Sequence, residues 1–332
     1  MNRTFLLKPY VGYSAAFILL CFFIIYPFLV DAEFSYLVYF LYTTFIYVTM
    51  AQGWNLAAGY TGQVSLGQHA FFGVGCYVTA IIWRAGWTGY LDPLAMLMSG
   101  SGAAFVAIIV GLPLLAKLRG DYFALGTLGL GEILRAVAIN GGSLTEGTAG
   151  ISLPSSEYLS MMHYYFIALA IAVFTLLVVW CITRSRIGLA LIAIREDETA
   201  AASNGIALLR YKILAFAIGA FVTGLCGSLN AYYSFHVNSS GAFSLNWVIV
   251  PILMASLGGA GTFLGPILGS FILAGVYELA NIWMPELHPI FSGAFIVLVA
   301  LFLPDGIMSY ITGRKDRVLR KLPVFHWMFQ KT

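Results

Sequence analysis

Charged residues are scarce in this chain. Of its 332 residues only 9% are Asp, Glu, Lys or Arg, against about 25% in a typical soluble domain. Residues 34–83 and 213–277 contain no formal charge at all, and 60% of the chain is hydrophobic. A chain of this composition cannot cover a water-facing surface, which excludes a soluble enzyme and a disordered protein. It is a membrane protein, made either of helices or of a β-barrel.

The apolar runs also lack the alternation of polar and apolar residues that barrel strands require. Each charge-free run is longer than the roughly 20 residues that one helical span needs, so each holds more than one span. The sequence therefore predicts an all-α, polytopic helical bundle.

Motifs for catalysis are missing as well. The chain has no Gly-Lys pair, so it cannot form a nucleotide-binding P-loop, and it has neither an H-E-x-x-H nor a G-x-S-x-G motif. Its five histidines are scattered, and its four cysteines lie in apolar runs without C-x-x-C spacing. We expect no enzyme activity, no metal site and no cofactor in this chain, and its short loops leave no surface for nucleic acid.

Ten membrane segments are predicted, and alternating them across the bilayer from a cytoplasmic N-terminus puts both termini in the cytoplasm. Fifteen Lys and Arg residues then lie on the cytoplasmic side and only Arg84 lies outside, while Arg135 falls within a segment. This asymmetry follows the positive-inside rule. The predicted segments are residues 11–30, 34–53, 64–83, 94–116, 122–140, 158–183, 213–235, 244–260, 263–281 and 289–308.

Glycine is concentrated in three stretches, residues 62–75, 126–131 and 258–269. Glycine allows helices to pack closely, and it also marks broken or re-entrant helices that line a solute path. Both interpretations remain open. Ser65-Leu66-Gly67 recurs as Ser256-Leu257-Gly258, a weak sign of internally related halves.

Ionisable residues inside a membrane segment need a reason, because burying a charge there is costly. Glu132 and Arg135 lie three residues apart and share one face of a helix. They form either a structural ion pair or part of a translocation path. For Glu278 we favour an interfacial position over a coupled proton site.

The longest predicted cytoplasmic loop, residues 184–212, combines helix-forming residues with a central charged cluster. Gly205 is placed to end a helix there. The pattern predicts a short helix on the cytoplasmic face, which either lies at the membrane interface or docks a soluble partner.

This loop resembles the coupling segment of ABC importer permeases, which has an E-A-A-x3-G type signature. Ala200-Ala201-x3-Gly205 fits it, with Thr199 as a departure after Glu198. A longer form, G-x-A-x-x-A-I-R-E-[ND]-E-x-A-A-x3-G-I, is typical of LivM-type permeases for branched-chain amino acids. This chain matches it with Gly188, Ala190, Ala193, Ile194, Arg195, Glu196, Asp197, Glu198, Ala200, Ala201, Gly205 and Ile206.

Three further stretches resemble the same family, at residues 55–73, 118–129 and 256–266. They include Asn55-Leu56-x2-Gly59-Tyr60, Leu118-Arg119-Gly120-Asp121 and Ser256-Leu257-Gly258-Gly259. Gln68-His69 is a departure, because the family often has histidine directly after the glycine.

The resemblance covers about residues 50–308 and implies one transmembrane permease domain over residues 1–332 in the bacterial cytoplasmic (inner) membrane. Residues 184–212 would be its coupling loop, and residues 309–332 a basic cytoplasmic tail beside anionic lipids. It implies a LivH-type second permease, two cytoplasmic ATPases that carry ATP and Mg²⁺, and an extracytoplasmic binding protein. The residues expected to couple to the ATPases are Arg195, Glu196, Asp197, Glu198, Ala200, Ala201 and Gly205.

The path for a zwitterion with an apolar tail needs helix ends or backbone dipoles for its charged groups and small residues to make room. Candidates on that ground are Gly62, Gln63, Ser65, Gly67, Gln68, Gly126, Thr127, Gly129, Glu132, Arg135, Gly258, Gly259 and Gly261. Two other functions stay open. One is a permease of the same family for urea or short amides, and the other is an ion-coupled carrier that works alone.

Overall fold

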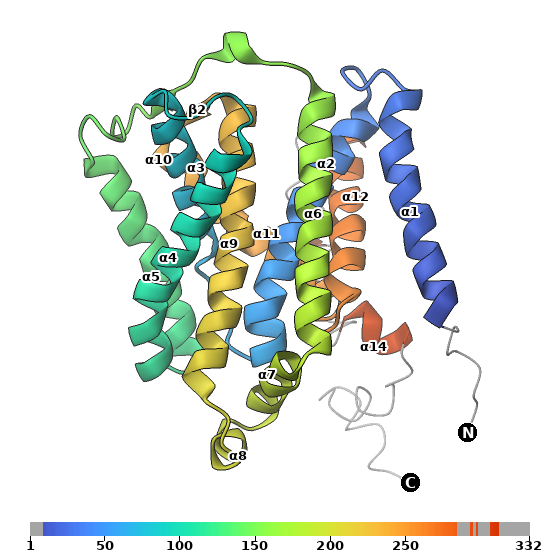
Figure 1. Ribbon diagram of the computed structural model, residues 1–332, viewed down its shortest axis with the longest axis vertical. Helices are drawn as coiled ribbons and strands as arrows, with labels where there is room; N and C mark the ends of the chain where they lie inside the picture. Colours follow the sequence, from blue (N-terminus) through green and yellow to red (C-terminus); the bar gives the residue numbers. More distant parts are fainter. Residues whose placement is uncertain (1–8, 284–292, 295–296, 298–305, 312–332) are drawn as a thin grey trace.

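The computed structural model describes residues 9–283, 293–294, 297 and 306–311. Long helices lie side by side, with α7 and α8 at one end of the bundle and β2 and α10 at the other (Figure 1). The elements are α1 (Pro9–Leu29), α2 (Tyr36–Trp54), the π-helix η1 (Asn55–Gly59), α3 (Gln68–Arg84), α4 (Pro93–Lys117), α5 (Asp121–Asn140), β1 (Ile151–Ser152), the 3-10 helix η2 (Ser155–Glu157), α6 (Met161–Arg184), α7 (Arg186–Glu196), α8 (Glu198–Ser203), α9 (Leu208–Ser234), β2 (His236–Val237), α10 (Ser239–Ala242), α11 (Asn246–Gly258), α12 (Gly265–Trp283) and α14 (Ile307–Ile311).

Helix starts follow local capping chemistry. Asp92 accepts a hydrogen bond from the backbone N–H of Leu94 at 2.8 Å, and Pro93 takes the first position of α4. Ser160 and Ser185 cap α6 and α7 in the same way. Each cap satisfies a backbone donor that the helix itself leaves free.

Helix α9 is the centre of the bundle, since 72% of its apolar window is buried. Glycines bring its neighbours to backbone contact. A Cβ on Gly75 of α3 would lie 2.2 Å from the carbonyl oxygen of Gly224, and one on Gly227 would lie 2.1 Å from that of Phe72. Close backbone packing of this kind is the usual way for helices to associate in a membrane.

A knot of hydroxyl groups ties the same three helices together. The Oγ1 of Thr79 on α3 lies 2.7 Å from the Oγ of Ser99 on α4 and 2.6 Å from the Oγ of Ser228 on α9. All three side chains are buried. Buried polar groups that satisfy one another stabilise a helix interface within the membrane.

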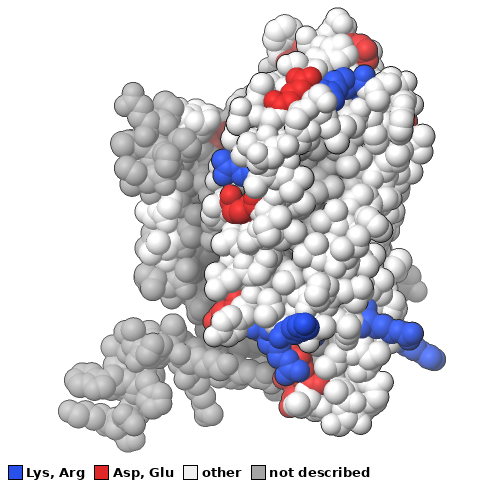
Figure 2. All heavy atoms as spheres, turned by 90° about the vertical axis from the view of Figure 1, so that its left-hand side faces the viewer, with Lys and Arg blue, Asp and Glu red and all other residues white. Residues whose placement is uncertain are grey.

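Six helical stretches of the described chain are long and apolar enough to cross a membrane, which makes this a multi-pass membrane protein. They are Pro93–Lys117, Asp121–Asn140, Met161–Arg184, Leu208–Ser234, Ser239–Gly258 and Gly265–Ile282, and each matches a predicted segment closely. Charges gather near the two ends of the face seen in Figure 2, and most of the surface between is uncharged.

The third predicted segment, residues 64–83, begins too early. Helix α3 starts at Gln68, and residues 62–67 are not helical. Arg3, Lys8, most of segment 289–308 and the basic run from Arg314 to Lys321 lie outside the described residues.

Candidate functional site

Two interruptions in the helices form the core of the candidate site. We call residues 55–67, from η1 to the start of α3, the first break, and residues 259–264, between α11 and α12, the second break. Gly62 has φ +76°, and Gly259 and Gly261 have φ +118° and +79°, which only glycine adopts readily. The third glycine-rich stretch, residues 126–131, shows no such interruption and lies within α5.

Side chains from the end of α2 and the start of η1 join the two breaks. Gln52 Nε2 donates to the carbonyl of Phe263 at 2.7 Å, and Asn55 Nδ2 donates to that of Thr262 at 2.9 Å. The N–H of Gly261 donates to Asn55 Oδ1 at 2.7 Å. Both side chains are fully buried. Segments more than 200 residues apart in sequence are thus held together by their backbones.

The first break is also fixed to α5. The Oγ1 of Thr127 accepts the N–H of Leu66 at 3.0 Å, and the Nε1 of Trp54 donates to the carbonyl of Ser65 at 2.9 Å. A Cβ on Gly67 would lie 2.9 Å from the carbonyl oxygen of Thr127. These contacts satisfy backbone groups that would otherwise stay unpaired inside the membrane.

His69, in the first turn of α3, is fully buried against α5. A Cβ on Gly131 would lie 1.8 Å from its Nε2. Neither ring nitrogen has a hydrogen-bond partner within the described chain, and neither does Oε1 of the neighbouring Gln68. Unpaired buried polar atoms are uncommon, so this start of α3 is the least satisfied polar part of the site.

The loop predicted to hold one short helix holds two, α7 and α8, which are separated at Asp197. Asp197 ends α7 in an extended conformation and caps α8, accepting the N–H groups of Thr199 at 2.8 Å and Ala200 at 3.0 Å. These bonds, led by the one from the Thr199 hydroxyl, hold the pKa of Asp197 below its usual range. The Asp197 side chain therefore sets the angle between the two helices.

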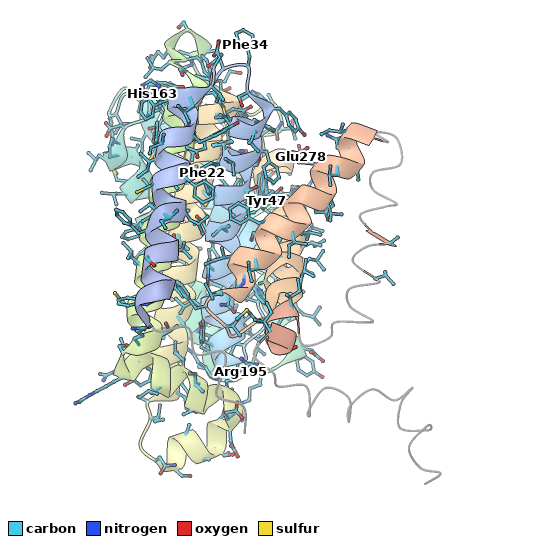
Figure 3. All side chains as sticks on the ribbon, turned by 90° about the vertical axis from the view of Figure 1, so that its right-hand side faces the viewer. Phe22, Phe34, Tyr47, His163, Arg195 and Glu278 are labelled. Atoms are coloured by element: carbon cyan, nitrogen blue, oxygen red, sulfur yellow. The ribbon has the colours of Figure 1, made fainter. Side chains whose placement is uncertain are left out.

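Arg195, at the end of α7, reaches into the bundle. Its Nη1 donates to the carbonyl of Gly59 in the first break at 2.7 Å. The same nitrogen occupies the place where a Cβ on Gly261 would lie, 1.8 Å away. Figure 3 shows Arg195 at the end of the molecule opposite Phe34 and His163.

Glu198, at the start of α8, also points inward. Its Oε1 accepts from Lys212 Nζ at 2.6 Å and from Gln63 Nε2 at 2.7 Å, and its Oε2 lies 4.0 Å from Nε of Arg119. The Lys212 side chain is only 4% exposed and that of Glu198 is 22% exposed. A buried charge requires a partner of opposite charge, so Glu198 anchors α8 to α9 and to the first break.

The other predicted coupling residues face outward, except Ala201, which is buried. Glu196, Asp197, Ala200 and Gly205 are exposed. The segment α7–α8 therefore has one face fixed to the bundle by Arg195 and Glu198 and an opposite face that is free to meet another molecule.

The Glu132–Arg135 pair forms on α5 with an N–O distance of 3.5 Å, and both side chains are substantially exposed, at 52% and 41%. Leu125, Ile133 and Val137 on the same helix are exposed as well. A charged pair on the apolar flank of a membrane helix needs protein or water beside it rather than lipid.

Glu278 on α12 accepts a hydrogen bond from the hydroxyl of Tyr36 at the start of α2. Figure 3 shows it on the side of α12 where Tyr47 lies. The contact joins the two helices on one flank of the bundle, far from the breaks. Glu278 is thus separate from the other candidate residues.

The structure brings the sequence candidates together in two groups. Gly62, Gln63 and Gly261 lie near Arg195 and Glu198, whereas Ser65, Gly67, Gln68 and Thr127 lie where the first break meets α5. Sequence reasoning did not single out Asn55, Gln52, Lys212 or His69. Two polar residues in a charge-free run, Gln52 and Asn55, were the available signal.

Within the described residues, no group of three or more His, Cys, Asp or Glu could hold a metal ion. The four cysteines are all free, two buried, one half-buried and one, Cys181, exposed.

A protein family described as the branched-chain amino acid transport system / permease component matches residues 36–300. The chain is 30% identical over 297 residues to the high-affinity branched-chain amino acid transport system permease protein LivM of Escherichia coli K12, covering 80% of this chain and 68% of that one. It is 26% identical to the corresponding LivH protein of Salmonella typhimurium, over 79% of this chain and 91% of that one.

A further relative is the autoinducer 2 import system permease protein LsrC of an Enterobacter species, at 27% identity over 70% of this chain and 68% of that one. No solved structure matches the chain.

Proposed function

The chain belongs to the family of branched-chain amino acid transport permease components, and from that premise we propose that it is a permease subunit of an ATP-driven importer. Its substrates would be leucine, isoleucine and valine. One observation carries the proposal beyond the family. The α7–α8 segment holds the first break at two points, through Arg195 on Gly59 and Glu198 with Gln63. Movement of α8 therefore reaches the interior of the bundle directly.

We infer ten membrane segments with related halves in the bacterial inner membrane, and α7 and α8 on the cytoplasmic side. The distribution of positive charge supports this orientation. Lys117, Arg119, Arg184 and Arg210 flank the end that carries α8, whereas Arg84 lies at the far end of α3. Excess Lys and Arg mark the cytoplasmic side.

The exposed face of α8 would bind an ATPase, one on this chain and a second on a related permease. ATP and Mg²⁺ would be held by those ATPases, since this chain has no Gly-Lys pair with which to build a P-loop. The LivH relative supports a pair of related permeases. We assign the exposed flank of α5, with Glu132 and Arg135, to the contact with that second permease or to the path beside it.

A binding protein would deliver the amino acid to the opposite end. Glu33, in the α1–α2 connection, supports an ordered surface there. It accepts from Tyr158 Oη at 2.6 Å and from the N–H of Met161 at 3.0 Å. These donors lower the pKa of the Glu33 carboxyl, so it stays ionised and holds the α5–α6 connection in place.

The first test is purification of a tagged copy from its native membrane, with identification of the proteins that come with it. A related permease and P-loop ATPases are expected, and leucine presented with the binding protein should stimulate ATP hydrolysis by the complex. A chain that purifies alone and takes up substrate by itself would contradict the proposal.

Other solutes are the second candidate, because the LsrC relative is named for a different one. Uptake measured for branched-chain amino acids beside urea and short amides separates these cases. An ion-coupled carrier would instead use Glu132 or Glu278. Its uptake would stop when ion gradients are collapsed with ATP intact, whereas that of the importer would continue.

A further inference from the structure

The two breaks make contact through their backbones, and Asn55 is the residue that satisfies both. Its side-chain amide donates to Thr262 and accepts from Gly261, and both bonds are shorter than 3.0 Å. Asn55 is fully buried, so no water is available to replace either bond. Loss of Asn55 would leave an N–H and a carbonyl of the second break without partners.

The space around Asn55 admits no larger residue. A Cβ on Gly59 would lie 2.0 Å from Asn55 Oδ1 and 2.5 Å from the nitrogen of Gly261. Asn55 and Gly59 are the first and last residues of the π-helix η1. Short π-helical turns of this kind frequently mark functional sites, and here the wide turn places the Gly59 carbonyl next to the second break.

Arg195 is the charged residue that reaches this place from the cytoplasmic segment. Its guanidinium donates to Gly59 and fills the space above Gly261, so it touches both breaks at once. A guanidinium is planar, always charged and carries five donors in a fixed arrangement. It therefore holds two backbone segments in a defined relation, which a flexible ammonium group does less well.

We propose that Asn55 and Arg195 form one joint, through which the α7–α8 segment sets the relative position of the first and second breaks. Both are positioning residues for transport, and Arg195 acts inside the bundle instead of on the ATPase-binding face. This inference rests on the proposed function for its role in transport. The joint itself is a structural link that can be measured without transport.

The transport test uses the full complex in proteoliposomes with Arg195→Gln, Asn55→Ser and the double variant. Arg186→Gln is the matched control, because it makes the same change at an exposed position at the other end of α7. The ratio of leucine taken up to ATP hydrolysed is expected to fall at least about fivefold in each single variant, the lower range for coupled sites. The control should keep the wild-type ratio.

The double variant is expected to lose no more than the worse single variant, because the two residues act through one joint. Losses that multiply would show two independent effects and overturn the proposal, as would an unchanged ratio in Arg195→Gln. Failure of Arg195→Gln to retain the ATPases during purification would place Arg195 on the docking surface and overturn it as well.

Hydrogen exchange on the purified chain tests the link by itself. Arg195→Gln should speed exchange of the backbone amides at residues 59–62 and 261–263, and Arg186→Gln should not. If the wild-type complex takes up no amino acid while this exchange result holds, the proposed function fails and the joint stands. Unchanged exchange in Arg195→Gln would refute the joint whatever the wild-type complex transports.

Discussion

The ion pair between Glu198 and Lys212 predicts an unequal cost for removing either partner. Lys212 is 4% exposed, so Glu198→Gln leaves an ammonium group buried without a carboxylate. Breaking a buried pair in this way costs about 3–5 kcal/mol. Because Glu198 is 22% exposed, this variant should destabilise the chain by an amount near the lower end of that range.

Lys212→Met should cost less, about 1–2 kcal/mol, since a hydrogen bond to a charged group is lost but the charge is not isolated. The Glu198 carboxylate keeps the bond from Gln63 Nε2, stays near Arg119 and has partial access to water. The double variant Glu198→Gln/Lys212→Met should be more stable than Glu198→Gln alone, because no buried charge remains.

The assay is unfolding of the purified chain in mixed micelles with increasing SDS, followed by tryptophan fluorescence. Lys117→Met is the control, because Lys117 is exposed and its replacement should change the free energy of unfolding by less than about 0.5 kcal/mol. Equal costs for the two single variants, or a double variant whose cost is their sum, would refute the reasoning.

Three further predictions use the same unfolding assay. Gly131→Ala drives a methyl group into the ring of buried His69 and should cost about 1–3 kcal/mol, whereas Gly129→Ala on the same helix meets no atom within 4 Å and should be neutral or slightly stabilising; the idea fails if the two variants behave alike. Gly261→Ala combines φ +79° with the loss of room for a guanidinium and should cost at least about 1–2 kcal/mol from the backbone conformation alone; a wild-type free energy of unfolding would contradict this. The lowered pKa of Glu33 means that its contribution is complete above the ordinary value of 4.5 and is lost as the pH falls through the lowered folded value; Glu33→Gln should flatten the pH dependence of stability in that acidic range and leave it unchanged at higher pH.

Much of the architecture could be predicted because its causes are local. A run of apolar residues without charge must be a membrane helix wherever it lies in the fold, so the six apolar helices fall where hydropathy put them. Capping is local too, and Asp197 begins α8 through bonds to the next three residues.

The pattern of glycines was informative but ambiguous. Gly62 and Gly261 take positive φ at the breaks, whereas Gly126 and Gly129 lie in a continuous helix. The residue type is the same in both cases. Only the packing around each glycine decides whether its freedom is used for a turn or for the approach of a neighbour.

What the sequence by itself determined is the class of the protein, the position of most helices and the place of the segment α7–α8. The tertiary structure alone decided that Arg195 and Glu198 turn toward the bundle while Glu196 and Ala200 face outward. It also decided that Asn55 meets Gly261, 206 residues away. Hydropathy and helix caps depend on residues a few positions apart, whereas these contacts depend on how distant helices pack, and no short stretch of sequence contains that information.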